Sequence, residues 1–450
     1  MRAAMVARWT AGLALAAWTM PAAAQNAPPV PEGLDLAAST RLRYEAIANP
    51  PRAGLDTDES LVNLRTILHG SYRRGTVSVV AELWDSRVYG DGADTPVTTG
   101  EVNTAELVQA YLGIEHRFGE AKIAARIGRM TLNIASRRLV AADDYRNTTN
   151  GYTGVAVDLA PRRGMTGTLI YVLPQQRRPD DRAGLRRNGV AIDRESFDVV
   201  LWGGTLTQTD AVGPLAVEGS FYHLGERDTP GRPTRDRRLD TYGGRVFRDA
   251  DTRKPDIEIE GFYQSGSIST AATVGAPRMP VSAWFVHGDA GYTFAGAWKP
   301  RVAIEYDYAS GDRAGGSYGR FDTLFGMRRA DLAPSGLYNA IARTNISTPG
   351  VRVEVLPSKR VDAFVSYRAM WLAARTDAFS TTNVRDPRGN AGSFAGHQID
   401  SRLRWWIKPA VLRFEADAVI LAKGRFLNDA PNAPPRGTTA YGSLNLTATF

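Results

Sequence analysis

Charged residues occupy every second position in several segments of the chain, including VRVEV (351–355), RVAIEYDY (301–308) and IDSRLRWWIK (399–408). In the first of these, Arg352 and Glu354 alternate with valines. Arginine suits the recognition of carboxylate and phosphate groups, because its planar guanidinium donates two parallel hydrogen bonds and stays charged. Repeated on several segments, this spacing indicates surfaces on which charged side chains are gathered.

A spacing of two is the period of a β-strand, so each segment is expected to carry one charged and one apolar face. A lipid-facing Arg or Lys near the membrane midplane costs about 2–4 kcal/mol, whereas the interior of a wide barrel holds water. The charged faces are therefore predicted to line an aqueous pore. The pore-lining residues that this alternation assigns are Arg43, Arg65, Arg126, Arg352, Glu354, Asp400, Arg402, Arg404 and Arg413.

Strand-like alternation recurs about eighteen times along the chain. The expected strands are 36–47, 61–72, 75–86, 105–117, 121–132, 151–159, 165–173, 196–208, 214–224, 239–248, 256–266, 282–294, 300–310, 346–356, 360–374, 395–408, 410–422 and 440–450. The connections between them are alternately short and long, an arrangement typical of outer-membrane barrels. The sequence therefore predicts an all-β fold, a transmembrane antiparallel β-barrel with short periplasmic turns and long extracellular loops.

The N-terminal segment has the features of a secretory signal peptide. Arg2 and Arg8 precede an uncharged stretch that ends at Met20, and small residues lead to Gln25. The stretch is too short to span about 30 Å of hydrocarbon as an anchor helix. We expect residues 1–24 to be the signal peptide, 25–35 a Pro-rich leader and 36–450 one barrel. Such a leader is too short for the plug domain of an energised transporter, so passive diffusion is expected.

The final strand is predicted to close the barrel. Leu444, Leu446, Ala448 and Phe450 share one face of YGSLNLTATF, and the strand is expected to pair with residues 36–47, because lipid cannot satisfy a free sheet edge. The terminal Phe resembles the insertion signal of outer-membrane barrels. The expected partners are therefore the barrel-assembly machinery, which reads this strand, and outer-membrane lipid and lipopolysaccharide around the barrel.

Composition excludes other membrane architectures. The 450 residues include no cysteine, and no apolar run after the signal peptide approaches the roughly 18 residues of a helical span. A composition that is 43% hydrophobic and 23% charged fits a soluble β protein or an outer-membrane barrel, and the sorted loops favour the barrel. Aromatic residues expected at the headgroup level are Trp84, Tyr89, Tyr111, Tyr171, Tyr222, Tyr263, Tyr306, Tyr308, Trp371 and Tyr441.

Closure of the predicted barrel has a consequence for charge. It brings Arg43 and Arg65, on the first two strands, close to Arg402, Arg404 and Arg413, near the last strand. Such an arc of guanidinium groups favours anionic solutes. The alternative is that inward Arg and Glu pair across neighbouring strands, which would give a general small-solute uptake porin with little selectivity. The reversal potential under a salt gradient distinguishes the two.

Two stretches resemble the alginate-export family of outer-membrane porins. In residues 127–159 the matching motifs are Gly128-Arg129, Arg138-Leu139-Val140, Asp144, Arg146-Asn147 and Gly154-Val155. In 306–325 they are Gly311-Asp312 and Phe321-Asp322-Thr323-Leu324-Phe325, and the resemblance continues through 396–409 to the last strand. It covers nearly the whole mature chain.

The resemblance implies a monomeric eighteen-stranded barrel in the bacterial outer membrane, with an arginine-rich constriction that passes a polyuronate or smaller carboxylates. It also implies that Arg129 and Arg146 add to the positive wall. One departure is that the founding members close the pore with a long periplasmic turn near the C-terminus, whereas this chain has only Lys408-Pro409-Ala410.

Other classes of function have weaker support. An outer-membrane enzyme would need a nucleophile and a base at one rim, but the five histidines stand in no nucleophile motif. Nucleic-acid binding conflicts with the signal peptide and with bases interleaved among carboxylates. Acidic loop segments such as 249–256 lack EF-hand spacing, so they are expected to be solvated. We expect no enzyme activity, no cofactor and no metal site.

Overall fold

A computed structural model of the chain describes residues 32–92, 95–229, 231–329 and 331–450. The predicted signal peptide, 1–24, and most of the predicted leader lie outside the described residues. Leu34 and Asp35, the last two residues of that leader, belong to the first strand.

The regular secondary structure of the described residues is almost all β-strand. The strands are β1 (Leu34–Ala48), β2 (Glu59–Arg74), β3 (Val77–Tyr89), β4 (Asn103–Phe118), β5 (Ala121–Met130), β6 (Tyr152–Arg162), β7 (Met165–Pro174), β8 (Val199–Val212), β9 (Leu215–Glu226), β10 (Arg238–Arg248), β11 (Pro255–Ser269), β12 (Arg278–Thr293), β13 (Arg301–Ala309), β14 (Ile346–Ser358), β15 (Val361–Trp371), β16 (Phe394–Lys408), β17 (Leu412–Lys423) and β18 (Thr438–Thr449). Two short helices, α1 (Arg182–Arg186) and α2 (Arg425–Asp429), lie in connections. Each of the eighteen predicted strands is present, with ends shifted by a few residues. Neither helix in the described ranges has the length and hydropathy needed to cross a membrane.

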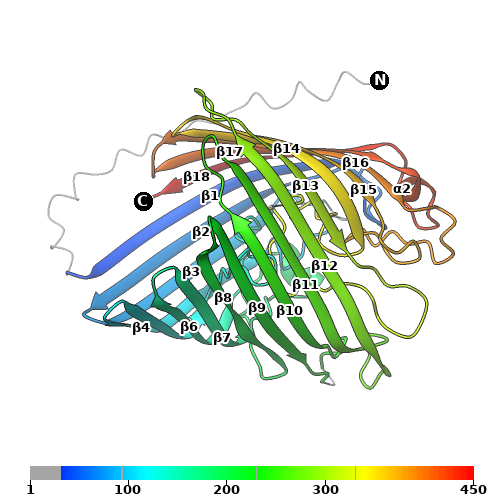
Figure 1. The fold of residues 1–450 in the computed structure, drawn as a ribbon. Helices are drawn as coiled ribbons and strands as arrows, with labels where there is room; N and C mark the ends of the chain where they lie inside the picture. The colour runs from blue at the N-terminus through cyan, green and yellow to red at the C-terminus, as the bar shows by residue number, and fades with distance from the viewer. Residues whose placement is uncertain (1–31, 93–94, 230, 330) are drawn as a thin grey trace.

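The sheet closes on itself, as the sequence predicts. Every strand pairs antiparallel with its sequence neighbours, and β18 pairs with β1 in a register that sets Leu42 opposite Leu446. Figure 1 shows these first and last strands side by side. Closure leaves no unpaired edge in the described sheet, so the backbone hydrogen bonds of β1 and β18 are satisfied by each other.

Alternation sorts the side chains between two faces. Leu42 and Tyr44 are exposed on the outer face of β1, and Leu444 and Leu446 are exposed beside them on β18. The intervening Arg41, Arg43 and Glu45 point inward and are buried. The apolar face is therefore outside and the charged face lines the lumen, as predicted.

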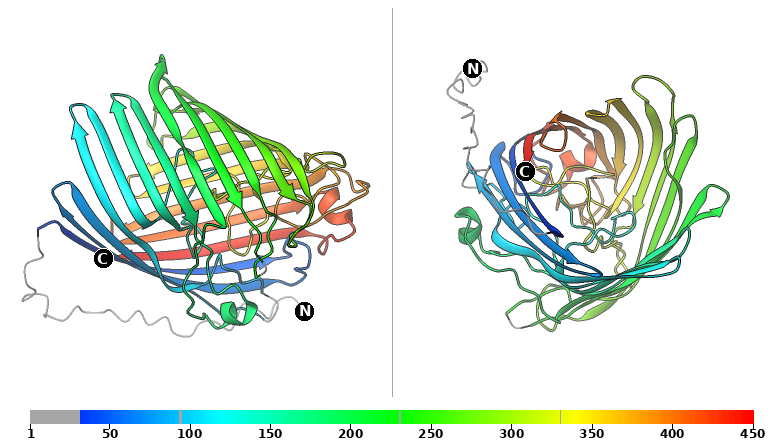
Figure 2. Two further views of the ribbon diagram at one scale, coloured as in Figure 1. Left: turned by 90° about the horizontal axis from the view of Figure 1, so that it is seen from below. Right: turned by 90° about the vertical axis from the view of Figure 1, so that its left-hand side faces the viewer.

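The connections form two different rims (Figure 2). At one end the strands are joined by short turns, including residues 409–411 between β16 and β17. At the other end the connections are long, and two of them, 131–151 and 310–345, turn back into the barrel. We call these two segments the inner loops. Their buried apolar residues, among them Leu139, Val140 and Tyr338, join the inner wall in one core.

Part of the predicted aromatic belt is wrong. Tyr171, Tyr263 and Tyr306 are exposed on the outer face, where a belt requires them. Trp84, Tyr222 and Tyr441 are instead buried on the lumen side. Of these three, Tyr441 contacts Tyr145 and Tyr338 of the inner loops. Aromatic content alone does not reveal which face of a strand a ring occupies.

Candidate functional site

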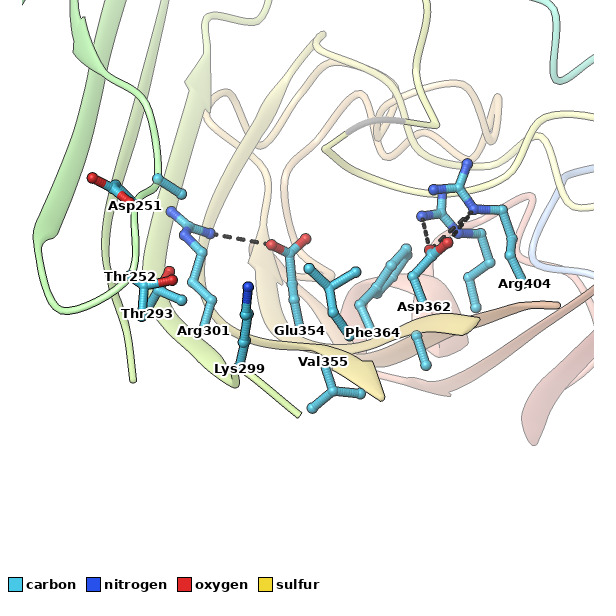
Figure 3. A pocket seen from close by; sticks show the side chains of 14 residues that line it. Asp251, Thr252, Thr293, Lys299, Arg301, Glu354, Val355, Asp362, Phe364 and Arg404 are labelled. Atoms are coloured by element: carbon cyan, nitrogen blue, oxygen red, sulfur yellow. Dashed lines mark hydrogen bonds and ion pairs between the residues drawn. The ribbon is translucent and has the colours of Figure 1, made fainter. Parts of the chain in front are cut away.

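Ion pairs within and between neighbouring strands line the lumen wall toward the short-turn end. Arg402 and Arg404 share Asp362 at N–O distances of 3.1 and 3.0 Å. Arg352 pairs with Glu354 at 2.7 Å, and Figure 3 shows Arg301 turned toward the same Glu354. A cavity of about 430 Å³ is lined by Arg301, Glu354, Asp362, Arg402 and Arg404. On this part of the wall the predicted arginines are largely neutralised by carboxylates.

A second stretch of wall carries arginines with no such partner. Strand register sets Arg413 of β17 opposite Thr447, Thr447 opposite Arg41 of β1, and Arg41 opposite Arg65 of β2. No carboxylate of the described residues lies within 4.0 Å of these three guanidinium groups. We call Arg413, Arg41 and Arg65 the arginine row.

Aromatic rings support both ends of the arginine row. The Arg65 guanidinium lies 4.6 Å from the centre of the Trp84 ring, and that of Arg413 lies 5.5 Å from the Trp406 ring. Stacking on a ring holds a guanidinium in place without removing its charge. Arg65 and Arg413 are both half-buried, so their charge reaches the lumen.

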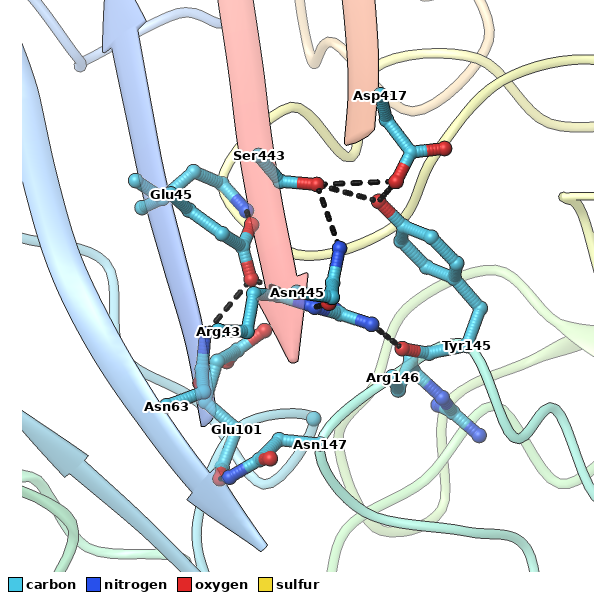
Figure 4. A network of polar contacts seen from close by, with 12 residues as sticks. Arg43, Glu45, Asn63, Glu101, Tyr145, Arg146, Asn147, Asp417, Ser443 and Asn445 are labelled. Atoms are coloured by element: carbon cyan, nitrogen blue, oxygen red, sulfur yellow. Dashed lines mark hydrogen bonds and ion pairs between the residues drawn. The ribbon is translucent and has the colours of Figure 1, made fainter. Parts of the chain in front are cut away.

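The inner loop 131–151 is bound to this wall by its backbone. Arg65 donates to the carbonyl oxygens of Asp144 and Arg146 at 3.0 Å, and Arg41 donates to that of Arg146 at 2.7 Å. Figure 4 shows Arg43 reaching the carbonyl of Tyr145 at 2.5 Å. Carbonyl oxygens accept these bonds but bring no negative charge, so the loop is held without neutralising the arginines.

The inner loop 310–345 is bound through side chains. Arg329 pairs with Asp400 of β16 at 2.6 Å and with Asp417 of β17. Tyr338 donates to Gln398 at 2.5 Å, and the backbone N–H of Leu337 donates to Glu45 at 3.0 Å. Arg329, Asp400 and Asp417 are all buried. This loop is therefore fixed across the wall from β16 to β1.

The two inner loops also pair with each other. The N–H of Phe325 donates to the carbonyl of Leu139 at 2.9 Å, and that of Ala141 donates to the carbonyl of Phe325 at 3.1 Å. Arg138 joins them to the wall, because it binds Asp331 at 2.8 Å, Glu260 at 2.6 Å and also Glu258. The lumen is narrowed by one assembly of both loops rather than by two independent segments.

The Asp331 carboxylate is strongly stabilised in its charged form. Burial by itself would raise its pKa, but the guanidinium groups of Arg138 and Arg343 outweigh this and hold the pKa well below the usual range. A depressed pKa means that the folded state gains stability above the ordinary Asp value, about 3.9, and loses it as the pH falls below that value.

Heat stability is therefore expected to respond to Asp331 only in acid. Lowering the pH from 7 to 5 should leave the Asp331 contribution intact, and lowering it from 5 to 3 should remove part of it. The measurement is the midpoint of heat-induced unfolding of purified protein at the three pH values. The Asp331→Asn variant should lose less stability between pH 5 and 3 than the wild type, and equal losses would contradict the assignment.

The remaining predicted residues divide between the two faces. Arg126 lines the lumen and pairs with Asp158 at 3.2 Å, and Arg146 lies in loop 131–151 and pairs with Asp143 at 3.0 Å. Arg129 does not line the lumen. It shares the face of β5 with the exposed Ile127.

The prediction for Arg129 is therefore corrected. Its guanidinium is bound at the long-loop end by Glu106 and, at 2.8 Å, by Glu195. The physical reason is the strand period, because positions 126 and 129 are three residues apart and must point to opposite faces. Arg129 neutralises carboxylates at this rim.

Several functional candidates lie on loops, where strand alternation gives no information. Arg138, Arg177, Arg328 and Arg329 all approach the lumen from connections between strands. The only sequence signal is that Arg138 and Arg329 each end an Arg-Arg pair inside a long connection. Neither pair reveals which carboxylates it meets.

The histidines have structural partners. His69 contacts Glu82 at 2.9 Å, and His223 and His287 each contact an aspartate at 2.7 Å. No cluster of three or more metal-ligating side chains occurs among the residues that the structure describes. Each of the three acid–histidine contacts joins neighbouring strands of the wall.

Comparison with known proteins gives a family match. The family described as alginate export matches residues 33–436. Among curated proteins, no sequence matches this chain.

Solved structures resemble the chain in fold. OccK9 (OpdG) of Pseudomonas aeruginosa superposes with a TM-score of 0.61 at 10% identity, over 93% of this chain and 98% of its own. OccD3 (OpdP) of the same organism gives 0.58 at 14% identity, over 93% and 91%. OpdK of the same organism, solved with vanillate, gives 0.57 at 12% identity, over 92% and 98%. At these identities the likeness is one of fold alone.

Proposed function

The chain belongs to the alginate-export family, and from that premise we propose that it is a passive channel with a preference for anionic solutes. Its family and fold are those of porin-type channels of the bacterial outer membrane, not those of enzymes. The long-loop rim accordingly faces the cell exterior and the short-turn rim the periplasm. The preference for anions and the class of solute are the parts that we propose.

The observation that carries the proposal is the arginine row. Arg65 and Arg413 are half-buried in the lumen wall and have no carboxylate within 4.0 Å among the described residues. Field lines concentrate in a water-filled passage with low-dielectric walls, so unbalanced positive charge there attracts anions and repels cations. The wall near Asp362 and Glu354 contributes less net charge, because every arginine there has a carboxylate within 4.0 Å and Arg301 also pairs with Asp256 and Asp289.

Small carboxylates are the solutes that the interior favours. The inner loops are held in the lumen by buried ion pairs of Arg138 and Arg329. Because these loops occupy part of the lumen cross-section, a single small solute passes more easily than a polymer chain. OpdK, which shares the fold, was solved with vanillate, itself a small carboxylate. A polyuronate is the larger solute with which small carboxylates should be compared.

A planar-bilayer measurement tests the preference. Under a salt gradient the wild type is expected to show a reversal potential of the sign that anion permeation gives. One unit charge at about 8 Å in water contributes about 0.5 kcal/mol. The double variant Arg65→Gln/Arg413→Gln removes about 1 kcal/mol of attraction for an anion and about 1 kcal/mol of repulsion of a cation. The anion-to-cation permeability ratio should therefore fall about thirtyfold in dilute salt, and less where salt screens the charges.

The matched control removes two charges from a loop that does not touch the row. Arg425 and Arg436 are exposed in the connection between β17 and β18, and Arg425→Gln/Arg436→Gln should leave the ratio unchanged. A cation-selective wild type would eliminate the proposal. An unselective wild type that admits solutes by mass alone would leave a general porin.

A further inference from the structure

A polar cavity of about 260 Å³ lies among four extracellular loops, 90–102, 131–151, 175–198 and 310–345. We call it the loop pocket. Its charged lining residues are Arg146, Arg177, Arg328, Asp143 and Glu101. All of them belong to connections rather than to strands, so the loop pocket is distinct from the arginine row on the wall.

The carboxylates of the loop pocket do not balance its cations. Asp143 pairs with Arg146 at 3.0 Å. Glu101 accepts hydrogen bonds from the backbone N–H and the hydroxyl of Thr98, at 2.9 and 2.6 Å. Neither carboxylate forms an ion pair with Arg177 or Arg328.

Among the residues that the structure describes, Arg177 and Arg328 bind only neutral oxygens. Arg177 donates to the carbonyls of Thr99 and Thr149 and to the amide oxygen of Asn150, at 2.7, 3.1 and 2.9 Å, and Arg328 donates to the amide oxygen of Asn339. Burial lowers the pKa of Arg177 to about 9 and that of Arg328 to about 10. A bound anion would supply the missing negative charge.

The rest of the lining is polar. The hydroxyl of Ser335 is buried and has no hydrogen-bond partner among the described residues, although its side chain lines the loop pocket. A buried hydroxyl without a partner loses free energy that a ligand hydroxyl or carboxylate could restore. The large apolar side chains of the lining are only Leu324 and Phe325, which offers little surface for an aromatic ring.

We propose that the loop pocket binds a single small hydroxylated carboxylate, such as a sugar acid, with the carboxylate on Arg177 and Arg328 and a hydroxyl on Ser335. This inference rests on the proposed function, since it names the solute that an anion-preferring channel captures at its outer mouth. Ligand pockets commonly measure about 300–1,000 Å³. A cavity slightly below that range holds one sugar acid and excludes a polymer segment.

Single-channel recording with sodium D-glucuronate on the extracellular side tests the proposal. The wild type should show current interruptions that saturate with concentration. The Arg328→Gln variant removes a charge-assisted contact, so the half-saturating concentration should rise about tenfold. Arg328→Lys keeps the charge and should lie between the two. Arg313→Gln removes an exposed arginine of the same loop, outside the loop pocket, and should match the wild type.

The comparison solutes and variants separate the outcomes. Glucose, which lacks the carboxylate, and benzoate, which lacks the hydroxyls, should both interrupt the current more weakly than glucuronate. The proposal would be overturned if benzoate interrupted the current as strongly as glucuronate, or if Arg328→Gln responded to glucuronate as the wild type does. If Arg328→Gln fails to fold, two other variants provide the same test. Arg177→Gln changes a different loop, 175–198, and Ser335→Ala leaves the charge of the loop pocket unchanged.

The proposed function and the loop pocket can fail separately. A wild type that prefers anions but has the same glucuronate response as Arg328→Gln and Arg177→Gln would leave the channel selective and the loop pocket wrong. A cation-preferring wild type would overturn the proposed function and, with it, the inference drawn from it.

Discussion

Replacing Arg329 with Met is expected to destabilise the folded interior by about 3–5 kcal/mol, the cost typical of removing one partner from a buried ion pair. Arg329 is 5% exposed and binds Asp400 and Asp417 on the adjacent strands β16 and β17. Without the guanidinium, two buried carboxylates are left to repel each other. Loop 310–345 should then leave the lumen for part of the time, which would appear as a larger and noisier single-channel conductance.

Two further variants make the Arg329→Met result specific. Arg313→Met removes the same charge from an exposed position of the same loop and should leave conductance unchanged. Adding Asp400→Asn and Asp417→Asn to Arg329→Met should recover part of the lost stability, because no buried charge then lacks a partner. An Arg329→Met channel with wild-type conductance and heat stability would show that other contacts hold the loop.

Replacing Arg138 with Met is expected to separate the inner loops from the wall and to weaken their contact with each other. Arg138 is buried and meets three carboxylates, Asp331 of one inner loop and Glu258 and Glu260 of β11. Its removal takes a guanidinium partner away from all three carboxylates. The free energy of unfolding is therefore expected to fall by at least about 3–5 kcal/mol. Trypsin applied from the extracellular side should then cleave loop 310–345, which the wild type protects.

The control for Arg138→Met is Arg137→Met. Arg137 precedes it in the same loop and has no ion pair with a described carboxylate. Arg137→Met should therefore remain resistant to trypsin, with cleavage followed by gel electrophoresis and the cut sites read by mass spectrometry. Equal resistance of the Arg138 variant would mean that the Phe325–Leu139 backbone pairing is enough to keep the loops in place.

The barrel could be predicted from sequence because its wall obeys one simple rule. Alternation assigns Arg413 and Arg65 to the lumen, and closure makes their strands near neighbours, with β18 and β1 between them. Each step follows from local period and from the absence of hydrogen-bond partners in lipid. The same rule, applied strictly, also places Arg129 outside, because it is an odd number of positions from Arg126.

The interior could not be predicted because its contacts have no period. Arg329 meets Asp400, and Arg138 meets Glu260, through the folding of long connections whose path depends on tertiary packing. Sequence likewise does not reveal that Arg402 and Arg404 share one aspartate while Arg413 has none. The distinction between neutralised and unbalanced arginines, on which the proposed anion preference depends, became visible only with side-chain geometry.

The pairing between the inner loops also constrains the order in which the protein assembles. Arg138 and Asp331 are 193 positions apart in the chain, and contacts over such separations form slowly, since the intervening chain must first be organised. Until the segments that carry Asp331 and β18 have folded, loop 131–151 has neither the Asp331 carboxylate that binds Arg138 nor a completed ring. The contacts between the inner loops are therefore expected to form late in folding. A barrel that closes before they form would be an intermediate with an unobstructed, conducting lumen.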